Sequence, residues 1–263
     1  TKKIVFTGDS GNSPTPLLKD TEKIKDADYV VMDSVYGDRN HESKEERDAK
    51  FERILKEGIA RGGAIVIPAF SLERTQVILY ELNNLIEEKK IPSVPVFLDS
   101  PLALKVTDIY KHTSKYFNQG VQKEIKGGDD IFSFPKLRIV KDSRESKTLV
   151  EEPNPKIIIA GSGMSSGGRV IHHEMNYLPD PKSTILLMGY QAVGTLGRAI
   201  QEAPKELVIL DTVVPVRARI EMISGYSSHK DSEHLADMMA DTAEHATKVF
   251  VVMGEPRASL FLV

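Results

Sequence analysis

Residues 155–173 read PKIIIAGSGMSSGGRVIHH, which is a β-branched strand, then a glycine-rich loop, then the start of a helix. The apolar run from Ile157 to Ala160 is continuous, as is typical of a strand buried on both faces. Similar runs alternate with helical patterns along the chain: Ile4 to Phe6, Tyr29 to Met32, Ala64 to Ile67, Val94 to Leu98, Thr184 to Met188, Leu207 to Leu210 and Lys248 to Val252. This alternation predicts an α/β fold with a mostly parallel sheet flanked by helices.

Two of the helices have clear sequence limits. Ser43 and Glu46 have the spacing of a capping box, and Gly62-Gly63 ends the apolar stripe that follows. A second stripe runs roughly from Leu72 to Glu88, and we expect it to face a sheet.

The composition is that of a soluble protein. Apolar residues make up 40% of the 263 and charged residues 28%, and no apolar run is long enough to span a bilayer, so no membrane partner is expected. The absence of cysteine excludes disulfides and thiolate metal sites and favours the cytoplasm. The net charge of −3 means that nucleic-acid binding would depend on local clusters. One basic stretch is interleaved with acids and more readily forms a solvated face than an RNA contact: Lys136, Arg138, Lys141, Arg144 and Lys147.

The two ends of the sequence give a different kind of information. Thr1 stands just before a predicted strand, and Leu260 to Val263 read as a helix cut short. We therefore expect an internal piece of a longer chain. The length suits two unequal domains.

Polar residues follow the predicted strands, at the sheet edge where functional groups of α/β proteins gather. Asp9 follows the first strand and Asp33 ends the second. A single aspartate there more often caps a turn or helix, but several together indicate a site. His229 lies among serines and glycines in SGYSSHKD, without the apolar neighbours of a core histidine, so a functional role is favoured.

The glycine-rich loop could hold a phosphate. Its backbone N–H groups precede a helix, and its serines add donors. It matches neither the Walker pattern nor the dinucleotide fingerprint, so alone it is a weak signal.

Taken in order, seven motifs resemble the β-CASP branch of the metallo-β-lactamase superfamily: FTGDSG, DSVYGDRNH, PAFSLERTQVILYEL, FLDSPLA, AGSGMSSGGRVIHH, GYQAVGTLGR and SGYSSHKD. The resemblance covers nearly the whole chain. It implies a β-CASP cap at residues 34–215, and the second half of a metallo-β-lactamase αββα sandwich at residues 1–33 and 216–263. It also implies that single-stranded RNA binds in the cleft between these two domains.

The resemblance implies roles for single residues. Asp9 matches the carboxylate that bridges two zinc ions, Asp33 the motif A acid, and His229 the motif B histidine, a general acid oriented by Asp33. Contacts to phosphate or RNA are implied for Arg74, Ser162, Ser165, Ser166 and Ser227. The implied reaction is zinc-dependent hydrolysis of RNA, in RNA processing or decay.

Two departures qualify this picture. The family's His-x-His-x-Asp-His motif lies upstream of the FTGDSG strand, where this sequence begins. Met253 stands where RNA-cleaving members usually carry a histidine ligand, and DNA-processing relatives have an apolar residue there. We therefore expect two Zn²⁺ in the intact protein, but neither stable zinc nor cleavage from residues 1–263.

Three alternatives stay open at this point. The chain could be a non-catalytic module that binds RNA or a partner, a DNA-directed nuclease of the same family, or a small-molecule phosphoesterase. Homodimerisation is likewise left open.

Overall fold

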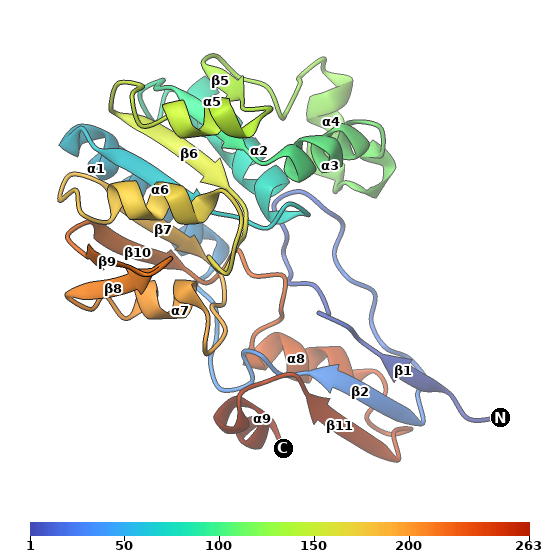
Figure 1. The fold of residues 1–263 in the computed structure, drawn as a ribbon. Helices are drawn as coiled ribbons and strands as arrows, with labels where there is room; N and C mark the ends of the chain where they lie inside the picture. The colour runs from blue at the N-terminus through green and yellow to red at the C-terminus, as the bar shows by residue number, and fades with distance from the viewer.

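The computed structural model describes all 263 residues and has two lobes of unequal size, each built on a parallel sheet (Figure 1). The larger sheet has the strand order β10-β7-β3-β6-β4-β5 and the smaller sheet β1-β2-β11. A two-stranded antiparallel hairpin, β8-β9, lies beside the larger sheet. The expected α/β class with mostly parallel sheets is confirmed. No helix is both long enough and apolar enough to cross a membrane.

The larger sheet consists of β3 (Ala64–Pro68), β4 (Val96–Asp99), β5 (Leu137–Ile139), β6 (Lys156–Ala160), β7 (Thr184–Met188) and β10 (Arg219–Ile223). The smaller consists of β1 (Ile4–Phe6), β2 (Tyr29–Asp33) and β11 (Lys248–Val252), and the hairpin of β8 (Glu206–Ile209) and β9 (Thr212–Pro215). The helices are α1 (Lys44–Arg61), α2 (Arg74–Glu87), α3 (Pro101–Lys111), α4 (Gln119–Lys126), α5 (Ser143–Thr148), α6 (Val170–Tyr177), α7 (Leu196–Gln201), α8 (Ser232–Ala240) and α9 (Pro256–Leu262), with a 3-10 turn at Ser114–Tyr116.

The core lies on both faces of the larger sheet. Every residue of β3, β4, β6 and β7 is buried, as their continuous apolar runs predict. One face packs against α1 and α2, through residues such as Phe51 and Leu82. The other packs against α6 and α7, through residues such as Tyr177 and Ile200.

Helix α1 has the predicted ends. Ser43 and Glu46 form both hydrogen bonds of a capping box, and Gly62 ends the helix with a left-handed φ of 72°. Gly63 then enters β3 so close to Lys182 that a Cβ atom would lie 2.2 Å from the Lys182 carbonyl oxygen. A side chain at position 63 would therefore collide with the backbone that leads into β7.

Three features differ from the sequence expectations. The run from Leu207 to Leu210 supplies most of β8 (Glu206–Ile209) of the hairpin, where only Ile209 is buried. Strand β10 was not predicted, yet it pairs with β7 along its whole length. The chain therefore returns to the smaller sheet after Ile223, and not near residue 216 as expected.

The smaller sheet is covered on one face only. Helix α8 packs Leu235 and Met238 against Val30 and Met32 of β2. On the opposite face, Phe6, Val31 and Phe250 lie in one row across the three strands. Phe6 is 73% exposed and Phe250 48% exposed, so this row faces solvent.

Candidate active-site cleft

Two residues from opposite parts of the sequence meet between the lobes. Asp33 ends β2, and His229 lies in the loop between β10 and α8. His229 Nδ1 lies 3.4 Å from Asp33 Oδ2, with the carboxylate fully buried and the ring 17% exposed. This distance is longer than a well-formed hydrogen bond, but catalytic contacts often tighten only when substrate binds. The structure thus brings together the expected acid and its orienting partner.

Asp33 is held by further hydrogen bonds. The Ser10 hydroxyl donates to Oδ2 at 2.7 Å, and the Val35 N–H donates to Oδ1 at 3.1 Å. Burial raises the pKa of Asp33, but the contacts with His229 and Ser10 outweigh it and hold this pKa below its usual value. The carboxylate is therefore ionised at neutral pH and can stabilise a charged imidazole.

Glu42 fixes the turn that presents His229, and sequence reasoning did not single it out. Its carboxylate accepts from the Ser224 N–H at 3.0 Å, the Gly225 N–H at 2.8 Å and Lys50 at 2.7 Å. Burial opposes ionisation, but these contacts outweigh it and lower the pKa of Glu42 to about 2. The His41 ring supports the same turn, 2.9 Å from the His229 carbonyl oxygen.

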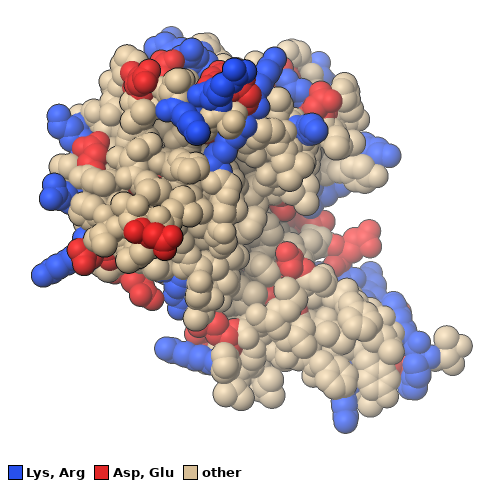
Figure 2. Space-filling view, viewed as in Figure 1, with Lys and Arg blue, Asp and Glu red and all other residues tan.

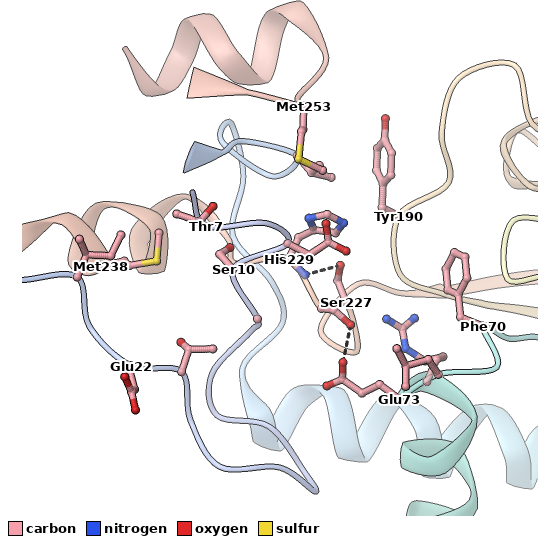
Figure 3. A pocket seen from close by; sticks show the side chains of 18 of the residues that line it. Thr7, Ser10, Glu22, Phe70, Glu73, Tyr190, Ser227, His229, Met238 and Met253 are labelled. Atoms are coloured by element: carbon pink, nitrogen blue, oxygen red, sulfur yellow. Dashed lines mark hydrogen bonds between the residues drawn. The ribbon is translucent and has the colours of Figure 1, made fainter. Parts of the chain in front are cut away.

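A cavity of about 930 Å³ opens beside His229, and we call it the cleft cavity (Figure 3). Both lobes line it, with Asp9, Ser10, Glu22 and Met253 from the smaller and Phe70, Glu73, Arg74, Met164 and Tyr190 from the larger, next to Ser227, Ser228 and His229. Arg74 and Ser227, which the resemblance implies as contacts to phosphate or RNA, thus both line the cleft cavity. Figure 3 shows Ser227 and His229 between Ser10 on one side and Glu73 and Phe70 on the other.

The serines of the glycine-rich loop do not line this cavity. Ser162 donates to the Gly167 carbonyl oxygen at 3.2 Å and accepts from the Ser166 N–H at 3.0 Å. Ser165 is 1% exposed and donates to Glu174, whose pKa is raised to about 8 by burial. These hydroxyls bond to the loop itself and to α6. The structure does not place Ser162, Ser165 or Ser166 in the lining of the cleft cavity, although contacts to phosphate or RNA were expected of them.

Arg74 is the cation of the cleft. It is the first residue of α2, it is 5% exposed, and its Nη1 has no hydrogen-bond partner. The guanidinium packs so close to Gly189 that a Cβ atom there would lie 2.7 Å from Nη1. Burial lowers the pKa of Arg74 to about 10, which leaves it charged at neutral pH. A buried, unpaired guanidinium beside a cavity is suited to a phosphate.

Glu73 is a second residue that the sequence did not reveal. It has φ 61° and ψ −59°, and the Arg74 N–H donates to the Leu72 carbonyl oxygen at 2.7 Å, which together make a γ-turn. Its carboxylate accepts from the Ser228 hydroxyl at 3.1 Å. Backbone strain of this kind clusters at functional sites. Phe70, 41% exposed, adds an aromatic face to the same wall of the cavity.

The donors at the cleft do not by themselves fit a zinc pair. Asp9 lines the cavity as an exposed carboxylate, and Met253 offers a thioether from the end of β11. Nowhere in the 263 residues do three His, Cys, Asp or Glu side chains come together as a metal site. Catalytic zinc needs about three protein ligands, and a thioether is a poor one.

Comparison with known proteins identifies the family. Residues 75–200 match the family model of the Beta-Casp domain, and residues 213–263 match that of the Zn-dependent metallo-hydrolase RNA specificity domain. The chain belongs to the β-CASP branch of the metallo-β-lactamase superfamily. The first match to this β-CASP chain covers most of α2 to α7, and the second contains His229 and Met253.

Relatives resemble the β-CASP chain along nearly its whole length. Ribonuclease TTHA0252 of Thermus thermophilus is 35% identical over 261 residues, which are 99% of this chain and 59% of that protein. An RNase J-like protein of Methanocaldococcus jannaschii is 32% identical over 263 residues, 98% of this chain and 60% of its own. Transcription termination factor FttA of Methanosarcina mazei is 30% identical over 268 residues, which cover 98% of this chain and 42% of that protein. The chain therefore spans three fifths or less of these relatives.

Proposed function

We propose that this β-CASP chain binds single-stranded RNA in the cleft cavity, as part of a ribonuclease of RNA processing or decay. In this proposal it supplies the general acid for phosphodiester hydrolysis, His229, and the carboxylate that orients it, Asp33. The contact of His229 with Asp33, 3.4 Å long and beside a cavity lined by Arg74 and Ser227, carries this proposal. The names of the relatives support it, because one is a ribonuclease and another an RNase J-like protein.

In this proposal each cleft residue has a defined task. His229, when protonated, donates its proton to the oxygen that leaves the phosphorus. General acid catalysis of this kind raises the rate of a reaction about 10²- to 10⁴-fold. Asp33, buried and ionised, keeps the ring in place and stabilises its positive charge. Arg74 and Ser227 hold the phosphate, and Phe70 gives a neighbouring base a surface for stacking.

Zinc belongs to the proposal for the whole protein. The description of the second matching domain as Zn-dependent supports zinc there, and the number of two Zn²⁺ is part of the proposal. The donor set of residues 1–263 does not fit them, so further ligands would be needed. We accordingly propose that residues 1–263 bind RNA without cleaving it. A cytoplasmic location, supported by the lack of cysteine, is also proposed.

Binding and turnover measurements on residues 1–263 test the proposal. We expect fluorescence anisotropy to give tighter binding to single-stranded RNA than to DNA of the same sequence, with no cleavage and no retained zinc after dialysis. Arg74→Ala should weaken RNA binding about tenfold, because a buried charged contact to phosphate is lost. Arg53→Ala, which removes an exposed cation on α1, should leave it nearly unchanged.

Other outcomes would contradict particular parts of the proposal. Equal affinity for DNA would support the DNA-directed alternative. Competition by a small phosphate ester as effective as RNA would support a phosphoesterase. Two zinc ions per chain with turnover would show that the assignment of the metal ligands is wrong.

A further inference from the structure

The larger lobe has a second cavity, of about 360 Å³, between α5 and α6. Its polar lining comes mainly from Ser143, Lys147, Arg169, His172, His173 and Asn176. No Asp or Glu lines it, whereas Asp9, Glu22 and Glu73 line the cleft cavity. Figure 2 shows blue Lys and Arg side chains, with some red Asp and Glu among them, over α5, on the face of the molecule where Figure 1 displays α6. We call this space the α5–α6 cavity.

A buried carboxylate holds the Arg169 and His173 side chains in place. Asp99 is fully buried at the end of β4, and it accepts from Arg169 Nη1 at 2.6 Å and lies 2.7 Å from His173 Nε2. Burial raises the pKa of Asp99, but its contacts with His173, Ser146 and Arg169 outweigh it and keep this pKa below its usual value. The His173 side chain is 3% exposed and the Arg169 side chain 20% exposed, and their contacts with Asp99 fix both before any ligand binds.

The rim of the cavity carries the adaptable donors. Lys147 is exposed on α5, and His172 and Asn176 are exposed on α6, so each can turn toward a ligand. Lys147 belongs to the basic stretch at residues 136–147, which the cleft does not use. Arg169 Nη1 and Nη2 also donate to the carbonyl oxygens of Val140 and Lys141, both at 3.4 Å, so its Nε–H is a fixed donor left for a ligand. Together with the mobile rim donors, it can hold a phosphate oxygen by several hydrogen bonds.

We propose that the α5–α6 cavity binds a phosphate group, and that in the RNA-bound protein this group is a backbone phosphate of the strand leaving the cleft. The glycine-rich loop connects the two sites, because Met164 lines the cleft cavity while Gly168 and Arg169 line the α5–α6 cavity. The RNA part rests on the proposed function. The phosphate site does not, because it rests on the lining of the cavity alone.

The test compares RNAs of two lengths on two variants. The double variant Lys147→Ala, His172→Ala removes rim donors, and Arg144→Ala removes a cation from the same helix that does not line the cavity. We expect the double variant to bind an RNA of about 16 nucleotides about 3- to 10-fold more weakly, and one of about 4 nucleotides unchanged. Arg144→Ala should change neither by more than about 2-fold.

Inorganic phosphate and a uridine mononucleotide are titrated in parallel, with the ring signals of His172 and His173 followed by NMR. Shifts of the His173 ring on phosphate addition that the double variant abolishes, without any dependence on RNA length, would assign the site to a free phosphate or nucleotide. No phosphate-dependent shift, or equal losses in Arg144→Ala and the double variant, would overturn the site. If the proposed function fails instead, the 4-nucleotide RNA does not bind the unaltered protein, yet the phosphate titration still decides the α5–α6 cavity.

Discussion

At φ 61° and ψ −59°, Glu73 has a backbone conformation that costs a residue with a side chain about 1–3 kcal/mol. Its carboxylate also lines the cavity beside Arg74, where an RNA phosphate is proposed to bind. Glycine would relieve the strain, while glutamine would keep the strain and remove only the charge. The two substitutions therefore separate the conformational role of Glu73 from its electrostatic role.

We expect Glu73→Gly to raise the free energy of unfolding by about 1 kcal/mol. This is the net of the relieved backbone strain and the larger entropy that glycine loses on folding. Both Glu73→Gly and Glu73→Gln should tighten RNA binding, because repulsion of phosphate is removed. Urea unfolding and anisotropy measure the two effects. If Glu73→Gln weakened RNA binding, the carboxylate would be a contact to RNA and not a repulsive group.

Glu42 gives a prediction about pH. Its folded pKa of about 2 lies below the usual value of 4.5, so its stabilising contribution is present above about pH 5 and is lost as the pH falls toward 2. Glu42→Gln should cost about 2 kcal/mol at pH 7 and progressively less below pH 5. Denaturant unfolding at several pH values measures the difference. The exposed Glu45→Gln serves as control, and a cost independent of pH would contradict the assigned role.

The sequence predicted some residues of the cleft and missed others for a physical reason. Asp33 and His229 could be found because a strand end and a serine- and glycine-rich turn are local patterns. Glu42 could not be found, because it binds a turn some 180 positions further along the chain. Glu73 could not be found either, because only its backbone angles distinguish it. The loop serines could not be placed from sequence, because the Ser162 hydroxyl is bonded within the loop and the Ser165 hydroxyl to Glu174 of α6.

At the scale of elements, apolar runs located strands better than they described burial. The runs of β6 and β11 are equally apolar, yet β6 is buried throughout and β11 is mostly exposed. The difference lies in the helices that cover each sheet, which a strand's own sequence does not contain. The hairpin β8-β9 shows the same limit, since its run reads like a core strand but pairs antiparallel at the periphery.

The junction between the glycine-rich loop and α6 gives a second pH prediction. Burial raises the pKa of Glu174 to about 8, while the unfolded carboxyl titrates near 4.5. Its protonated form therefore contributes stability that is fully present below about pH 4.5 and is lost as the pH rises through 8.

Glu174→Gln is expected to match the unaltered protein near pH 5, because the amide can still accept from the Ser165 hydroxyl. At pH 9 the variant should be more stable, by on the order of a few kcal/mol. Thermal or denaturant unfolding across this range provides the measurement, with the exposed Glu202→Gln as control. Parallel pH profiles for the variant and the unaltered protein would show that Glu174 ionises normally.

At the scale of the whole molecule, the two lobes differ in how much of their apolar surface is covered. The larger sheet has helices on both faces, whereas the row of Phe6, Val31 and Phe250 on the smaller sheet faces solvent. Leu260 and Phe261 of α9 are also exposed, at 78% and 69%. Exposed apolar surface of this kind mediates association or aggregation in solution.

We therefore expect residues 1–263 to self-associate through the smaller sheet as concentration rises. The double variant Phe6→Ser, Phe250→Ser should shift sedimentation toward the monomer and lower the binding of a hydrophobic dye, because it interrupts the exposed row at both edge strands. Leu102→Ser on α3 is the matched control, since Leu102 is 62% exposed but belongs to the larger lobe. RNA binding should be unchanged in both variants, because neither altered site lines the cleft cavity. A protein that stays monomeric at all concentrations, or that responds equally to Leu102→Ser, would show that this face is not where the molecules meet.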